Sequence, residues 1–137
     1  MPVPALKMNS LLRWLALALA LSLLGWLPFE DTSLQLIFAF SWAIVLLAAW
    51  GVLKRQFPRN VPWWAWLAAG LLAGAAVTPL ALLLMAVKTG LHGHGAPDFT
   101  GAQIQLASRL VALWLAAGGF LGLGAALLYR AAGEDGA

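Results

Sequence analysis

Four long apolar runs separated by short polar segments limit most strongly how this chain can fold. They cover about Leu11–Leu27, Ser33–Leu53, Pro62–Val87 and Gln103–Tyr129. A helix needs about 20 apolar residues to cross the hydrocarbon core of a bilayer, and each run is apolar all round, as a lipid-immersed helix is. Hydrophobic residues make up 63% of the chain and charged residues 9%, whereas a typical soluble domain has about 25% charged residues. The sequence predicts an all-α integral membrane four-helix bundle, one domain over residues 1–137.

The first run also has the length of a secretory signal core, and Lys7 and Arg13 precede it. The segment PFEDTS that follows has no small-x-small cleavage pattern, and three further apolar runs come after it. We therefore expect the first run to be retained as a membrane helix.

Lysine and arginine are divided unevenly between the two ends of the predicted helices. One end has Lys7, Arg13, Lys54, Arg55, Arg59 and Arg130. The other end has Lys88 and Arg109, together with Glu30, Asp31 and Asp98. The positive-inside rule places the basic end in the cytoplasm. The sequence thus predicts two transmembrane hairpins with both termini cytoplasmic and with the 88–101 loop on the lumenal or periplasmic face.

Tryptophans support these spans. Five of them fall near predicted helix ends, where an indole keeps its N–H in the wet headgroup layer: Trp14, Trp26, Trp50, Trp63 and Trp64. Trp42 and Trp114 lie deeper and are expected to be packing residues.

Small residues indicate where the helices meet, because leucine in lipid gains nothing by touching another leucine. Gly70 and Gly74 are four residues apart in the third run, and Gly118 and Gly122 are four apart in the last run. We expect these two helices to pack closely. Pro79 should kink the third helix, since proline removes one backbone donor and crowds the preceding turn.

The predicted span centres contain no Asp, Glu, Lys, Arg or His, which counts against ion-coupled transport. The chain has no cysteine, no H-E-x-x-H motif, no membrane-embedded Ser–His pair and no carboxylate cluster, so we expect it not to be an enzyme. The sequence pI is about 10.0, which in a soluble protein would suggest binding to nucleic acid. Here the basic residues flank apolar spans, where they determine the orientation of the helices in the membrane, so nucleic acid is not an expected partner.

The 88–101 loop, KTGLHGHGAPDFTG, differs from the rest of the chain because it contains both histidines. One interpretation is structural. Lys88 closes the third helix and reaches the head groups, and the glycines at 90, 93 and 95 permit unusual backbone angles. Thr100 and Gln103 form a capping box for a helical segment Gly101–Arg109 at the interface, with Asp98 as a competing cap.

The other interpretation of the loop is functional and leaves three alternatives open. His92, His94 and Asp98 provide three donors suited to zinc or copper. The histidines could instead titrate near neutral pH and sense acidity. In the third alternative the loop docks on a partner protein or a head group, with Lys88 and Arg109 as anion contacts.

The loop, followed by a Gln and a Gly-rich last helix that contains Trp114, resembles a small membrane protein family of cyanobacteria with no assigned function. The resemblance covers about residues 86–128 and is carried by Lys88, Gly90, His92, His94, Asp98 and Phe99. It implies a bacterial plasma membrane or a photosynthetic (thylakoid) membrane, and it implies no reaction.

The leading hypothesis is a non-catalytic accessory subunit or assembly factor of a larger membrane complex, with the 88–101 loop as its docking element. The alternatives are a small oligomeric transporter or channel for a neutral solute, and a metal- or pH-responsive membrane protein that uses His92 and His94. The expected partners are membrane lipid and other integral membrane subunits or further copies of the chain. No cofactor is required by the sequence, although its Trp-rich apolar surface suits a bound lipid or pigment.

Overall fold

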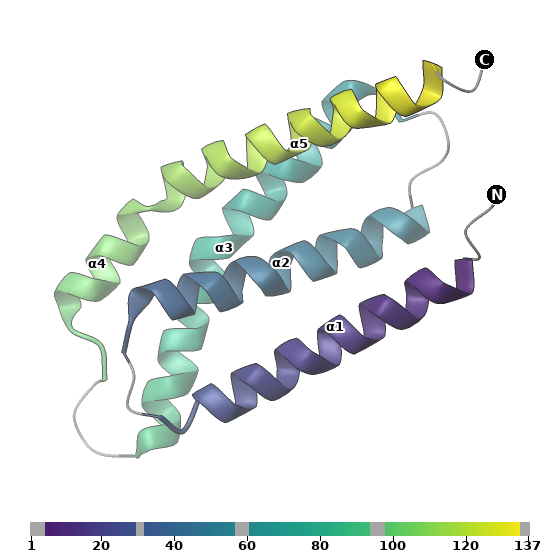
Figure 1. Cartoon of the computed structure of the whole chain (residues 1–137). Helices are drawn as coiled ribbons and strands as arrows, with labels where there is room; N and C mark the ends of the chain where they lie inside the picture. The colour runs from purple at the N-terminus through teal and green to yellow at the C-terminus, as the bar shows by residue number, and fades with distance from the viewer. Residues whose placement is uncertain (1–4, 30–31, 57–60, 94–97, 135–137) are drawn as a thin grey trace.

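The computed structural model describes residues 5–29, 32–56, 61–93 and 98–134, and within these ranges all regular structure is helical. The helices are α1 (Ala5–Trp26), α2 (Leu34–Gln56), α3 (Trp63–His92), α4 (Gly101–Arg109) and α5 (Val111–Glu134). Figure 1 shows α1 and α5 with their outer ends at the same end of the molecule, where α2 also ends and α3 begins.

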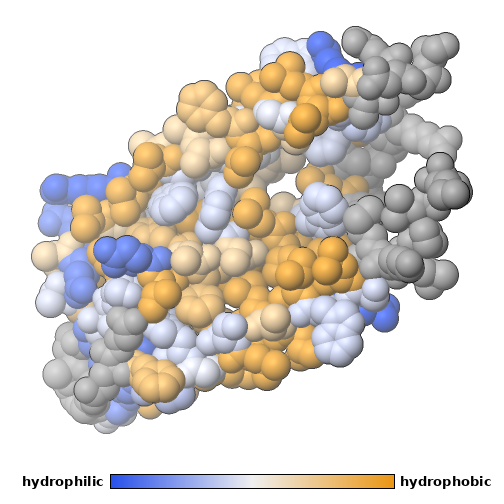
Figure 2. All heavy atoms as spheres, viewed as in Figure 1, coloured by the Kyte–Doolittle hydropathy of each residue, from blue (hydrophilic) through white to orange (hydrophobic). Residues whose placement is uncertain are grey.

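Three helical stretches of the described chain are long and apolar enough to cross a membrane: Leu34–Leu53, Trp63–His92 and Gly101–Ala131. They correspond to three of the four predicted spans. The fourth, at the N-terminus, corresponds to the shorter apolar helix Ser10–Trp26. Apolar side chains cover the middle of the face drawn in Figure 2, and the hydrophilic ones gather toward its two ends.

The third helix is longer than the sequence indicated. It continues past Val87 to His92 and ends at Gly93, whose φ of 61° is left-handed. Glycine is the usual residue at this position because it has no Cβ to clash there. Gly90, by contrast, lies inside the helix, and Gly95 lies outside the described residues. Pro79 is in the helix interior, and α3 changes direction along its length in Figure 1.

The last predicted span consists of two helices that meet at Leu110. The first, α4, coincides with the segment Gly101–Arg109, which the sequence predicted as the interfacial first part of the same helix. Leu110 is its C-cap and donates its N–H to the carbonyl of Ala107 at 3.2 Å, while its own carbonyl accepts from Trp114 at 3.1 Å. This tighter turn lets the chain change direction without a loop.

Helices α3 and α5 approach so closely that their backbones touch. A Cβ added to Gly70 would overlap the carbonyl oxygen of Gly118, and one added to Gly74 would overlap that of Trp114. A Cβ on Gly122 would lie 3.1 Å from the Cα of Leu67 and would overlap the neighbouring carbonyl. The four predicted glycines therefore form this crossing, because no side chain fits between the two helices.

The buried core lies between the first half of α2 and the second half of α3. Ile37, Ser41, Val77 and Ala81 are all buried there. Ser41 satisfies its hydroxyl within its own helix by donating to the carbonyl of Ile37 at 2.8 Å. Toward the opposite end of the bundle, α3 and α5 diverge from α2 (Figure 1).

Candidate functional site

The ammonium group of Lys88 lies among backbone carbonyls at the end of α1. Its Nζ donates to the carbonyl oxygens of Phe29, Leu27 and Trp26 at 2.6, 3.3 and 3.4 Å. It also lies 4.0 Å from the centroid of the Trp26 ring, within the range of a cation–π interaction. The Lys88 side chain is completely buried. We call Lys88 and these three carbonyls the carbonyl clasp.

The carbonyl clasp lies at the C-terminal end of α1. Trp26 is the last residue of the helix and also accepts from the backbone N–H of Phe29 at 3.1 Å, and Leu27 and Phe29 follow the helix. The last carbonyls of a helix have no N–H partner within the helix, and they form the negative end of its dipole. A lysine ammonium has three N–H donors and no acceptor, so it suits such a group of carbonyls. Lys88 therefore acts as a cap for α1, supplied by another helix.

This geometry corrects two expectations. Lys88 was expected to close α3 and reach a head group, but α3 continues for one more turn and the side chain is buried against α1. Trp26 was expected to keep its indole in the headgroup layer, but only 8% of it is exposed, because it lies under the ammonium group and against Phe40. The sequence offered no signal for either contact, since the acceptors are backbone carbonyls.

His92 extends the same cluster by one turn of α3. Its Nδ1 lies 2.6 Å from Oδ2 of Asp98, and its Nε2 lies 3.4 Å from the carbonyl oxygen of Pro28. Both partners are acceptors, so an imidazolium donates to both, whereas a neutral ring donates to one. The pair joins the end of α3 to the start of the α4 segment.

The metal hypothesis is only partly addressed by this geometry. Two of its three predicted donors, His92 and Asp98, lie together, and the third, His94, lies outside the described residues. Within the described part of the chain, no group of three or more His, Cys, Asp or Glu side chains is placed to hold a metal ion.

Thr100 begins α4 with a capping box. Its Oγ1 accepts from the backbone N–H of Gln103 at 3.3 Å, and Oε1 of Gln103 accepts from the backbone N–H of Thr100 at 2.8 Å. The amide of Gln103 also donates to the carbonyl of Thr32 at 3.4 Å, which ties α4 to the start of α2. Asp98, the competing cap, pairs with His92 instead.

The predicted anion contact Arg109 is exposed in the last turn of α4. Lys88, the other predicted anion contact, donates to carbonyls inside the fold. At this end of the molecule the linking side chains are Lys88, His92, Asp98 and Gln103, and the apolar Leu91, 63% exposed, faces outward.

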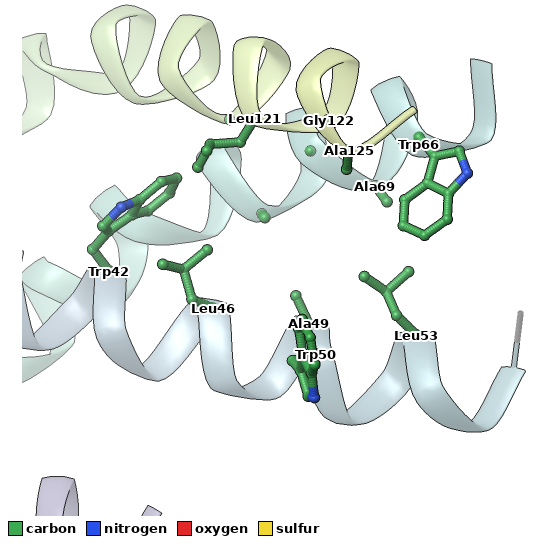
Figure 3. A pocket seen from close by; sticks show the side chains of 13 residues that line it. Trp42, Leu46, Ala49, Trp50, Leu53, Trp66, Ala69, Leu121, Gly122 and Ala125 are labelled. Atoms are coloured by element: carbon green, nitrogen blue, oxygen red, sulfur yellow. The ribbon is translucent and has the colours of Figure 1, made fainter. Parts of the chain in front are cut away.

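A second candidate site is an apolar groove of about 280 Å³ at the other end of the bundle. It lies between α2, α3 and α5, and we call it the α2–α5 groove. Figure 3 shows Leu46 and Leu53 of α2 projecting toward Leu121 and Ala125 of α5, with Trp42 at one end. The same opening is visible between α5 and α2 in Figure 2. A second groove of about 500 Å³ flanks the α2–α3 seam and shares Ala49, Leu53, Ala69 and Ala73 with the first.

The two deep tryptophans determine where the α2–α5 groove begins. Trp114 of α5 stacks on Phe38 with ring centroids 5.2 Å apart and lies 5.6 Å from Trp42. These rings fill the space between α2 and α5 up to Trp42. Beyond that level small residues line α3 and α5, so the space remains open.

Comparisons of the chain with protein-family models, with curated proteins and with solved structures found no significant match.

Proposed function

We propose that the protein is a non-catalytic accessory subunit or assembly factor of a larger membrane complex. The observation that carries this proposal is the way α1 is attached. The carbonyl clasp fixes its C-terminal end to α3, and along its length α1 lies beside α2 alone (Figure 1).

From Trp14 to Leu24, most of the surface of α1 that α2 does not cover is apolar and open. Trp14, Leu17, Leu21 and Leu24 are between 48% and 68% exposed. A helix anchored at one end with an open apolar surface presents a preformed face to a neighbouring membrane helix, and no ordering of the chain is needed before contact. This supports a role in association.

We further propose that the chain crosses the membrane four times, with both termini in the cytoplasm. The apolar helix Ser10–Trp26 spans about 25 Å at ~1.5 Å per residue, so it crosses a hydrocarbon core of ~30 Å by local thinning of the bilayer or by snorkelling of its flanking residues. The 88–101 loop then faces the lumen or periplasm of a cyanobacterial thylakoid or plasma membrane. Leu91 provides an apolar docking surface on this loop, because Lys88 and His92 form contacts within the fold.

The chemistry of the carbonyl clasp supports a non-catalytic role. Its ammonium donates to backbone carbonyls, and the neighbouring imidazole pairs with a carboxylate and a carbonyl. These groups hold helices together, and the lining of the α2–α5 groove is aromatic, aliphatic or glycine.

Extraction from the native membrane in a mild detergent tests the proposal, with the mass and composition of the resulting particle as the measurement. We expect the protein in a particle much larger than itself. Leu21→Ser on α1 should release it, whereas Leu127→Ser on α5, where the leucine is 69% exposed, should not. A lone monomer in mild detergent, with every major membrane complex intact after deletion, contradicts the proposal.

A further inference from the structure

We propose that Pro79 of α3 and Leu110, between α4 and α5, form one hinge. About this hinge, the end of the bundle that contains the carbonyl clasp moves relative to the crossing of α3 and α5, and the motion changes the width of the α2–α5 groove. The inference does not depend on the accessory role proposed above, because it concerns a motion within one chain. Its evidence is the level of the two bends, a buried hydroxyl beside Pro79, and the packing on either side.

The two bends lie at the same level of the bundle. Gly74 of α3 and Trp114 of α5 are in backbone contact, and the two helices run in opposite directions. One turn along α3 from Gly74 leads to Thr78, next to Pro79. One turn back along α5 from Trp114 leads to Leu110. Because neighbouring helices bend at one level, both can turn about the same point.

Each bend has a local cause that leaves the backbone less tightly held. Pro79 has no N–H, so the carbonyl of Ala75 lacks the donor that the interior of a helix normally supplies. The N–H of Leu110 donates to the carbonyl of Ala107, three residues earlier, where an α-helix would use the carbonyl four residues earlier. A tighter turn inside a helical stretch often marks a hinge.

The hydroxyl of Thr78 indicates a second position of the hinge. Within the described residues it has no hydrogen-bond partner, although only 5% of the residue is exposed. A buried hydroxyl without a partner costs free energy. Threonine in a helix can donate to a carbonyl three or four residues earlier, and Ala75 is three residues earlier. In the second position this hydroxyl donates to the carbonyl that Pro79 leaves without its N–H, as Ser and Thr do in membrane helices that contain proline.

The parts on either side of the hinge are each held together. On one side Gly70, Gly118 and Gly122 keep α3 and α5 in backbone contact. On the other side Lys88 ties α3 to the end of α1, and His92 ties it to the segment before α4. The α2 helix belongs to this second part, because its first half forms the buried core with the second half of α3.

The outer half of α2 has room to move. Both apolar grooves lie along it, and none of its described side chains after Val45 is buried. Next to the level of the hinge, α2 meets α5 through aromatic rings, with Phe38 and Trp42 against Trp114. A rotation about the hinge therefore widens or narrows the α2–α5 groove and leaves the buried core closed.

The test measures distances between pairs of spin labels by pulsed electron paramagnetic resonance, with the full-length protein in lipid vesicles. The chain has no cysteine, so each label needs one substitution. The test pair is Gly51→Cys on α2, where an added Cβ meets nothing within 4 Å, and Leu127→Cys on α5, where the leucine is 69% exposed. The control pair combines Leu127→Cys with Trp63→Cys at the start of α3, 49% exposed. We expect two distance populations for the test pair and one for the control pair.

Two prolines of α3 give matched variants. Pro79→Ala restores the missing N–H and should leave the test pair with one population. Pro62→Ala changes the N-cap and not the helix interior, so both populations should remain. Thr78→Val keeps the shape of the side chain without its hydroxyl. It should remove the second population and leave the one that corresponds to this structure.

A single population for the test pair in the parent protein overturns the inference, and so does a control pair with the same two populations. An unchanged distribution in Pro79→Ala also overturns it. If Pro79→Ala does not fold, Thr78→Val decides, and two populations in that variant reject the hinge.

Discussion

The Nζ of Lys88 lies 2.6 Å from the carbonyl oxygen of Phe29, a residue 59 positions earlier in the chain. This hydrogen bond, with those to Leu27 and Trp26, makes a side chain of α3 the cap of α1. It places an ionisable group completely inside the fold at the end where the helices come together. Lys88 is therefore the main polar link between the end of α1 and α3.

Replacing Lys88 by Met should destabilise the fold by about 1–3 kcal/mol, because buried carbonyls that lose their donor keep their desolvation penalty. Unfolding in a detergent titration measures the loss, and hydrogen exchange should show α1 opening first. Arg109→Met, at the same end but exposed, serves as the control and should change stability little. Equal stability of Lys88→Met and the parent would show that the carbonyl clasp does not hold α1.

Gly118→Ala should destabilise the protein by about 1–3 kcal/mol, since the added methyl overlaps the carbonyl of Gly70 and the two helices must separate. Gly124→Ala on the same helix meets nothing within 4 Å and should be neutral or stabilising by about 0.5–1 kcal/mol. Thermal unfolding in detergent compares the two. The contact between α3 and α5 is refuted if both variants behave alike.

Removing the capping box should loosen α4 without affecting the rest of the bundle. Thr100→Ala takes away the acceptor for the N–H of Gln103, and we expect a cost of about 0.5–2 kcal/mol. Faster exchange confined to the amides of α4 is the expected readout. Ser108→Ala is a suitable control, because its hydroxyl donates within the helix to the carbonyl of Ile104 and caps nothing.

His92 and Asp98 should act as one unit. His92→Gln and Asp98→Asn should each increase exchange at the junction of α3 and α4, and the double variant should lose no more stability than the larger single effect. Additive losses would show that the two side chains do not interact.

Zinc binding separates the structural role of His92 from the metal hypothesis. If His92 serves the fold through Asp98, the purified protein should bind no stoichiometric zinc, and His94→Ala should leave its metal content unchanged. Stoichiometric zinc that disappears when both histidines become Ala would establish the metal site instead. The measurement is metal analysis after dialysis against dilute zinc.

Several features could be predicted from the sequence because their causes are local. Runs of about 20 apolar residues predict membrane-spanning helices wherever they occur, and the described part of the chain contains three helical stretches of this kind. The capping box of Thr100 and Gln103 needs only residues three apart, and it forms where it was expected. The glycines at 70, 74, 118 and 122 also lie where α3 and α5 meet, because only glycine permits backbone contact.

The tertiary structure alone decided that Lys88 points inward, how α1 is attached and where the α2–α5 groove lies. The partners of Lys88 are backbone carbonyls, and every residue has one, so no residue type marks them in advance. The groove depends on how far the neighbouring rings of Trp42 and Trp114 hold α2 from α5. The sequence by itself determined which segments are helices and which helix faces carry small residues, because both properties depend on residues that are close together in the chain. The distances between helices follow from contacts between segments far apart in the chain, which only the folded protein brings together.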